Sequence, residues 1–207
     1  MAGKTAETGK KSRLIVGLSG ASGVAYGIRL LEALRELAME SHLVMSKAAE
    51  MTIGYETALE PRQVAAKADY TYAIGDIAAP IASGTFKTEG MVIAPCSVRT
   101  MSEIATGVTT TLLSRAADVT LKERRKLILM VRETPLHLGH LRTMTALAEM
   151  GAIILPPMPA FYAEPRTLED LVDQMVARAL DLLGHDWPTA RRWGEDLAKG
   201  KRKPQRK

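Results

Sequence analysis

The sequence predicts an α/β protein: a single doubly wound parallel sheet, in a three-layer sandwich of the Rossmann-like or flavodoxin-like kind. Two observations lead to this class. Short apolar segments alternate along the chain with helical patterns about 15 residues long. The apolar segments are also nearly continuous, with few polar residues between the apolar ones. Strands of this kind are buried on both faces, so helices must cover both sides of the sheet.

The first predicted unit is a strand, a turn and a helix. The strand is the apolar run at residues 14–18, and the turn is Ser19-Gly20-Ala21-Ser22-Gly23, which we call the small-residue turn. A helical pattern with Leu30 and Leu34 follows. Backbone N–H groups at the start of that helix would lie at the positive end of its dipole. We therefore expect a phosphate group to bind at the N-terminus of this helix.

The remaining elements follow in alternation. Pro135 is expected at the first position of a helix capped by Thr134 and ended by Gly151, and Thr167 is expected to cap the final helix. Further strands are predicted at residues 42–46, 70–77, 91–94, 126–131 and 152–155. Helices are predicted at 47–58, 102–117, 135–150 and 168–183, with a short helical or irregular piece at 61–67.

Composition limits the possible functions. The 207 residues suffice for one domain, expected at 13–198, and no apolar stretch is long enough to span a bilayer. A single cysteine and the lack of an apolar signal core favour a cytoplasmic protein. The net charge of +5 arises from two basic tails, residues 1–12 and 199–207, which are predicted to be disordered. The rest of the chain is net acidic, so nucleic-acid binding is not expected.

Polar side chains follow the predicted strands at the points where the strands end. Because the carboxyl ends of parallel strands meet at one edge of a sheet, we expect a ligand site there. The segments concerned are Ser19–Ser22, Ser46-Lys47, Ser97–Thr100 and Arg132–Thr134, with Phe161-Tyr162 after the last strand.

The ligand predicted from these residues is a phosphate monoester such as flavin mononucleotide (FMN). The glycines read Gly17-x-x-Gly20-x-x-Gly23, which is not the dinucleotide pattern G-x-G-x-x-G. Ser46-Lys47 also stands where a nicotinamide-binding sheet would place an acidic residue. An ATP-type G-x-x-x-x-G-K-[ST] loop is absent as well. Hydroxyl groups and cations around a small-residue turn remain, and they suit FMN.

Other chemistries have little support. His137 and His140 lie three residues apart but lack the partners of a zinc motif, so no metal site is predicted. The small-residue turn lacks the G-x-S-x-G elbow of serine hydrolases. Cys96 directly follows an apolar strand and is expected to pack there rather than act as a nucleophile.

Several long motifs resemble the UbiX-type flavin prenyltransferases, over roughly residues 13–193. They are S-G-A-S-G-V-A-Y-G-I-R-L-L (19–31), H-L-V-M-S-K-A-A (42–49), P-C-S-V-R-T (95–100), L-L-S-R-A-A-D-V-T-L-K-E-R-R (112–125), V-R-E-T-P-L-H-L-G-H-L (131–141) and P-A-F-Y-A-E-P (159–165). The resemblance implies an enzyme that transfers a dimethylallyl group from dimethylallyl monophosphate to N5 and C6 of reduced FMN without a metal. The prenylated FMN would serve a UbiD-type decarboxylase, and the assembly would be a homo-oligomer, a dodecamer.

The resemblance also assigns roles to residues. Glu133 would act with Ser22 in proton transfer as phosphate leaves, and Glu56 would help to remove the proton from C6. Trp193 matches a tryptophan that covers the site in some members. The cations Arg115, Lys122 and Arg132 would stabilise the leaving phosphate, and Tyr162 and Arg178 would bind the prenyl phosphate. FMN contacts would come from Gly20, Ala21, Ser22, Ser46, Ser97, Val98, Arg99, Thr100 and Arg132.

Three alternatives remain. A cysteine decarboxylase would share the fold, but its catalytic histidine near the first helix and its P-A-S-A-N-T segment are absent. An accessory subunit of a hydroxyarylic-acid decarboxylase would still supply the cofactor. The third is a flavin-binding module without catalysis, or a nucleic-acid-binding protein that acts through its tails.

Overall fold

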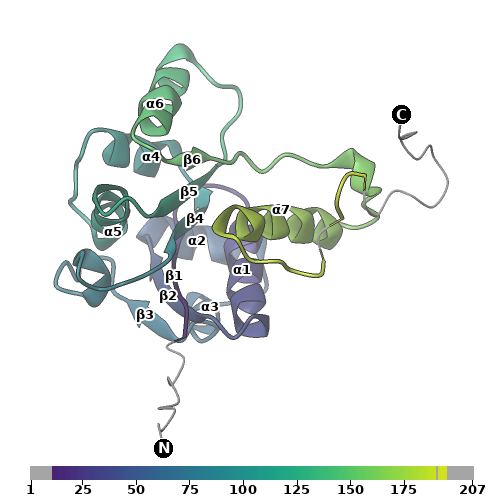
Figure 1. The fold of residues 1–207 in the computed structure, drawn as a ribbon, viewed down its shortest axis with the longest axis horizontal. Helices are drawn as coiled ribbons and strands as arrows, with labels where there is room; N and C mark the ends of the chain where they lie inside the picture. Colours follow the sequence, from purple (N-terminus) through teal and green to yellow (C-terminus); the bar gives the residue numbers. More distant parts are fainter. Residues whose placement is uncertain (1–10, 190, 195–207) are drawn as a thin grey trace, which may run out of the picture.

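The computed structural model describes residues 11–189 and 191–194, and these form one six-stranded parallel sheet with helices on both faces (Figure 1). The strand order is β3-β2-β1-β4-β5-β6, the doubly wound order in which the chain reverses direction across the sheet between β1 and β4. The predicted fold class is confirmed. The strands are β1 (Arg13–Leu18), β2 (Glu40–Met45), β3 (Tyr70–Tyr72), β4 (Gly90–Cys96), β5 (Lys126–Val131) and β6 (Ile153–Ile154).

Helices divide between the two faces of the sheet. One face is covered by α1 (Val24–Glu36), α2 (Lys47–Glu56), α3 (Pro61–Ala65) and α7 (Leu168–Leu183). The other is covered by α4 (Val98–Ala105), α5 (Leu112–Lys122), α6 (Leu138–Glu149) and the 3-10 turn η1 (Pro80–Ala82). A second 3-10 turn, η2 (Phe161–Ala163), lies in the long connection between β6 and α7.

Side-chain alternation along the strands builds two separate hydrophobic cores. In β1, Leu14, Val16 and Leu18 pack toward α1 and α7, whereas Ile15 packs with the helices of the opposite face. All of these side chains are at most 2% exposed. Burial on both faces explains the continuous apolar pattern of the strands in the sequence.

The structure corrects two predicted helices. The helix expected at 102–117 is two helices, α4 and α5, because Gly107 adopts a left-handed φ of 70° and Thr111 caps a new helix. The helix expected from Pro135 begins instead at Leu138, where the imidazole Nδ1 of His137 accepts hydrogen bonds from two backbone N–H groups. Pro135 follows a cis peptide bond in the preceding loop.

The other boundaries differ less. The strand expected at 70–77 covers only β3, since a turn closed by the Asp76 N–H on the Ala73 carbonyl follows it. Thr167 and Gly184 bound α7 as expected. The two predicted basic tails lie outside the described residues, apart from residues 11 and 12. Among the described residues, no helix is long and apolar enough to cross a membrane.

Candidate active site

A cleft of about 610 Å³ opens at the carboxyl ends of the strands, beside the switch point between β1 and β4. Its volume falls in the range of small-molecule sites. Every FMN contact predicted from the sequence lines it, together with Glu133. The lining residues are Gly20, Ala21, Ser22, Ser46, Lys47, Ala48, Ile74, Ser97, Val98, Arg99, Thr100, Glu103, Thr111, Leu113, Arg132 and Glu133.

Ser19 holds the two sides of this cleft together. Its side chain is fully buried; Oγ donates to the Pro95 carbonyl at 2.9 Å and accepts from the Ser97 N–H at 2.7 Å. The Ser19 N–H also reaches the Pro95 carbonyl at 3.2 Å. These bonds join the end of β1 to the end of β4, so the small-residue turn and the start of α4 keep a fixed separation.

Two helices begin at the cleft. Ser46 caps α2 by accepting from the Ala49 N–H, and Ser97 caps α4 by accepting from the Thr100 N–H. Both helix N-termini carry partial positive charge, which favours an anion. They, rather than α1, provide the electrostatic environment that a phosphate requires.

The expected phosphate site at the start of α1 is wrong, because a carboxylate already occupies that position. Glu56, at the end of α2, accepts from the N–H groups of Gly23 at 2.8 Å and Val24 at 3.1 Å through Oε2. The carboxylate thus caps α1 where a ligand anion would otherwise bind. The small-residue turn contributes to the cleft through Gly20 to Ser22 instead.

Gly20 allows the turn to approach α2 closely. A Cβ atom at this position would lie 2.3 Å from the Cβ of Ala48, which is far inside the contact distance of two carbon atoms. The absence of a side chain therefore lets β1 and α2 form adjacent walls of the cleft. The same contact explains why a small residue follows Ser46-Lys47 at the start of α2.

The end of β5 brings a cation and a carboxylate into the cleft. The Arg132 N–H donates to the Cys96 carbonyl at 3.1 Å, and Glu133 accepts from the Thr134 N–H at 2.9 Å. Burial raises the pKa of Tyr26 on α1, while the positive charge of Arg132 opposes that rise. Arg132 and Glu133 therefore add one positive and one negative charge to the lining of the cleft.

The residues predicted to bind the prenyl phosphate do not line this cleft. Thr111, the cap of α5, lines it, whereas Lys122 ends the same helix about 16 Å away. Arg115 is paired with Asp118 at 2.7 Å and Lys122 with Glu123, both within α5 or at its end. Within one chain, Arg115 and Lys122 are therefore not among the residues that line the cleft, whereas the third predicted cation, Arg132, is.

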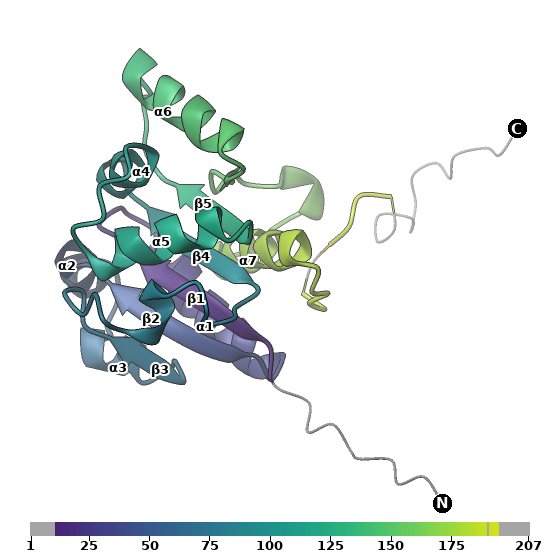
Figure 2. The same cartoon turned by 60° about the vertical axis from the view of Figure 1, so that its left-hand side comes forward.

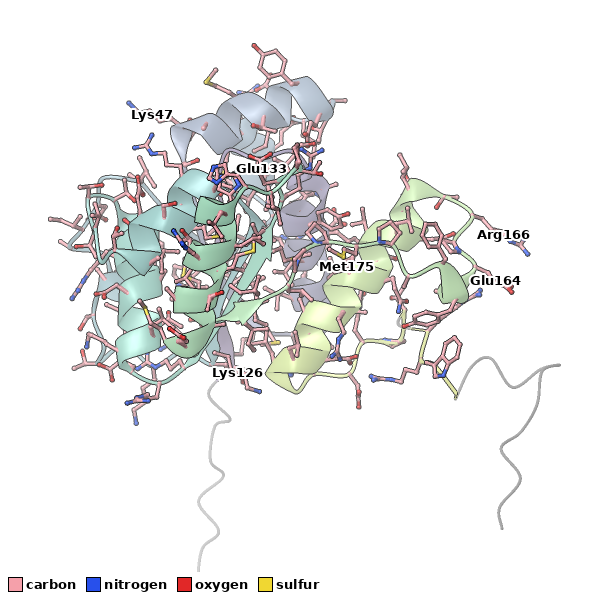
Figure 3. All side chains as sticks on the ribbon, turned by 90° about the horizontal axis from the view of Figure 1, so that it is seen from above. Lys47, Lys126, Glu133, Glu164, Arg166 and Met175 are labelled. Atoms are coloured by element: carbon pink, nitrogen blue, oxygen red, sulfur yellow. The ribbon has the colours of Figure 1, made fainter. Side chains whose placement is uncertain are left out.

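Tyr162 lies in η2, Arg178 on α7 and Trp193 in the segment after α7. Residues 161–168, which we call the arm, extend away from the sheet, whereas α7 packs against α1 (Figure 1). Tyr162 and Trp193 meet edge to face, with ring centroids 5.3 Å apart. Arg178 lies 4.0 Å from Asp181. Figure 3 shows Glu164 and Arg166 at the tip of this arm, across the molecule from Lys47 and Glu133.

Other candidate groups have structural surroundings. Cys96 is fully buried, and burial raises the pKa of its thiol to about 12, as expected for a packing residue. The rings of His137 and His140 stack with centroids 3.6 Å apart. Within residues 11–189 and 191–194, no group of three or more His, Cys, Asp or Glu is placed to hold a metal ion.

Comparisons with known proteins identify the family. The family described as Flavoprotein matches residues 3–180. The flavin prenyltransferase UbiX of Escherichia coli K12 is 59% identical over 170 residues, covering 82% of this chain and 90% of that protein. The Neisseria meningitidis serogroup B enzyme is 55% identical over 181 residues, covering 87% and 96%. The chain belongs to the flavin prenyltransferase family. The family predicted from the sequence motifs is thereby confirmed, and so is the predicted enzyme class, a transferase.

A solved structure agrees with this flavin prenyltransferase over most of its length. AnUbiX (PadA1), crystallised in complex with FMN and dimethylallyl pyrophosphate, superposes with a TM-score of 0.88 at 50% identity. The alignment covers 89% of this chain and 98% of AnUbiX. A dodecameric FMN-dependent UbiX-like decarboxylase from Escherichia coli O157:H7 has a TM-score of 0.86 at 52% identity, covering 87% and 98%.

The sequence did not reveal every functional feature of this flavin prenyltransferase. The buried bridge through Ser19 was missed, although its place directly after a strand could have suggested it. Capping of α1 by Glu56 was also missed, because these residues are 33 positions apart and no local pattern relates them. Leu113 and Ile74 form part of the cleft wall and gave no signal in the sequence.

Proposed function

We propose that this flavin prenyltransferase transfers a dimethylallyl group from dimethylallyl monophosphate to reduced FMN. The allylic C–O bond would break and phosphate would leave as a C–N bond forms at N5, which loses its proton. The alkene of the transferred group would then take up a proton at one carbon and bond to C6 through the other, and C6 would lose its proton. The observation that carries the proposal is the cleft, which is lined by every residue predicted to contact FMN and by Glu133. A flavin prenyltransferase that is 59% identical to this chain supports the same reaction. Bound FMN would supply the two nucleophilic atoms.

The residues present fit FMN. Its phosphate would bind between the N-termini of α2 and α4, where the N–H groups beyond Ser46 and Ser97 point outward. Gly20 to Ser22 would contact the rest of the molecule, because the turn presents backbone and only small side chains. Arg132 would balance negative charge at the cleft.

Negative charge on the leaving phosphate requires cations, and we propose that a second copy of the chain supplies some of them. Arg132 is in the cleft, but Arg115, Lys122, Tyr162 and Arg178 lie on other surfaces of the same chain. A homo-oligomer would bring these residues to a neighbouring cleft. We propose a dodecamer, the state named for the Escherichia coli O157:H7 relative.

Proton transfers would be carried out by two carboxylates, one in the cleft and one beside the small-residue turn. Glu133 lines it together with Ser22, whose hydroxyl can relay a proton to the departing phosphate. Glu56 lies on the other side of the small-residue turn and would take the proton from C6. The product would pass to a UbiD-type decarboxylase. The lone buried Cys96 suits the reducing cytoplasm that we assign to the protein.

The direct test is an anaerobic assay with reduced FMN and either dimethylallyl monophosphate or the diphosphate. We expect a flavin whose mass has increased by one dimethylallyl group, and no product with either donor would contradict the proposal. Arg132→Ala should lose most activity, whereas Arg62→Ala, 82% exposed on α3, should retain it. A chain without residues 199–207 should keep full activity, while loss of it would favour a function of the tail.

A further inference from the structure

The segment after α7 is held to that helix by an amide that pairs with its backbone. Gln174 Nε2 donates to the Arg191 carbonyl at 3.0 Å, and Gln174 Oε1 accepts from the Arg191 N–H at 3.1 Å. Both polar groups of one side chain are therefore used on one residue 17 positions away. Such a pair of bonds fixes both the position and the direction of the segment.

Arg191 extends this connection to η2. Its guanidinium Nη1 donates to the Ala163 carbonyl at 2.8 Å, immediately after Tyr162. The chain of contacts thus runs from Gln174 on α7, through the backbone of Arg191, to the turn that carries Tyr162. Arg192 separately anchors the segment through two bonds to Asp181, at 2.7 and 3.2 Å.

The aromatic pair that results is not a core contact. Trp193 is 74% exposed and Tyr162 is 38% exposed, although their rings meet at 89°. Burial therefore contributes little to their arrangement, which depends on the anchors on either side. A preformed, exposed aromatic pair with a phenol group offers an apolar wall for an allyl chain and a donor for a phosphate.

We propose that Gln174 is a positioning residue for the prenyl donor. Its two hydrogen bonds to the backbone of Arg191 place Trp193 against Tyr162 before the donor binds. The inference rests on the proposed prenyl transfer and adds a residue to it. Both polar groups of the Gln174 side chain are used on Arg191, so its effect would be on donor affinity through the aromatic pair. FMN binding should be unaffected, because none of these residues lines the cleft.

The test compares Gln174→Ala and Gln174→Glu with the wild-type chain. The Glu variant keeps the acceptor for the Arg191 N–H but places a carboxylate against the Arg191 carbonyl, so it should not restore function. Both variants should raise the KM for dimethylallyl monophosphate by about tenfold, because Ala loses both hydrogen bonds and Glu replaces one of them with repulsion between two oxygens. The kcat and the FMN Kd should stay within about twofold of wild type. Glu169→Ala, also exposed on α7, is the matched control and should change none of these values.

Fluorescence provides a second readout. The chain has two tryptophans, and subtracting the spectrum of Trp193→Phe isolates the emission of Trp193 from that of buried Trp187. We expect Gln174→Ala to shift Trp193 emission to the red as the ring leaves Tyr162. Unchanged emission, a donor KM within twofold of wild type, or a parallel loss of FMN binding and kcat would each overturn the proposal. If the wild-type chain prenylates no flavin, the proposed function fails, and Trp193 emission alone decides the positioning claim.

Discussion

Glu56 connects two tasks at the scale of a single residue. Its carboxylate caps α1 through the N–H groups of Gly23 and Val24, and it stands beside the turn that forms one wall of the cleft. The partial positive charge of a helix N-terminus attracts a carboxylate and holds it in place. The same bonds that satisfy α1 therefore also orient the proposed base next to the small-residue turn.

Two substitutions separate these tasks. Glu56→Gln keeps an oxygen that can cap α1 but removes the base, so we expect normal FMN binding and a reaction that stops after the first bond, with a mono-alkylated flavin detected by mass. Glu56→Ala also removes the cap and should lower the free energy of unfolding by about 1 kcal/mol. Chemical denaturation distinguishes the two variants. Normal turnover by Glu56→Gln would remove the catalytic role.

At the scale of the elements, a polar network joins the amino end of β2 to the carboxyl end of β3. His42, 2% exposed, lies between Tyr72, whose hydroxyl is 2.9 Å from Nδ1, and Glu40, whose Oε1 is 2.9 Å from Nε2. A neutral ring with its proton on Nε2 satisfies both partners. Arg13 holds Glu40 at 2.6 Å and lies over the Phe86 ring.

This network should make stability depend on pH. Burial lowers the pKa of His42, although the bond to Glu40 opposes the shift. The unfolded chain therefore takes up this proton first as pH falls below about 6.5. Stability should be complete above that pH and fall by at most about 1.4 kcal/mol per pH unit, until the folded-state pKa is reached.

The measurement is urea denaturation of the wild type and of His42→Gln at pH 8 and at pH 5.5. Glutamine can bond Glu40 and Tyr72 but does not titrate, so the variant should lose less stability between the two pH values. Equal losses would show that carboxylates such as Asp69 cause the pH dependence. Hydrogen bonds from Ser41 lower the pKa of Asp69, even though burial acts in the other direction.

The sequence predicts the elements well where the pattern is local. Strand β5 matches its predicted bounds because five apolar residues stand between charged neighbours. The prediction of one helix at 102–117 was wrong because the apolar pattern continues across a break in the backbone. Gly107 adopts a left-handed conformation there, and Thr111 caps a new helix. The cleft was predictable because parallel strands end at one edge. Contacts such as Glu56 with Gly23 depend on the packing of α2 against α1, which no local pattern encodes.

At the scale of the whole molecule, one chain exposes more apolar surface than a monomer requires. Of the residues in α6, only Leu147 is buried, while Leu138 is 60% and Leu141 is 47% exposed. Figure 2 shows α6 projecting beyond α4 and the sheet. On the arm, Phe161 is 79% and Leu168 is 75% exposed. Surfaces of this kind mark protein interfaces.

Assembly and catalysis should therefore fail together. In Leu138→Glu with Leu141→Glu, carboxylates would be buried at the proposed contact between copies, which is costly without partners. We expect light scattering to show species smaller than the wild-type assembly. Prenyl transfer should fall at least tenfold, because the cleft would lack Lys122 and Arg115 from a neighbour.

FMN binding is the measurement that separates this explanation from simple unfolding. The cleft is lined by residues of one chain, so the double variant should still bind FMN, which flavin fluorescence titration can detect. Arg62→Glu on exposed α3 introduces an acidic charge elsewhere and should leave assembly and activity unchanged. A smaller species with full activity would mean that one chain completes the site alone. Arg115 and Lys122 would then have no part in phosphate departure.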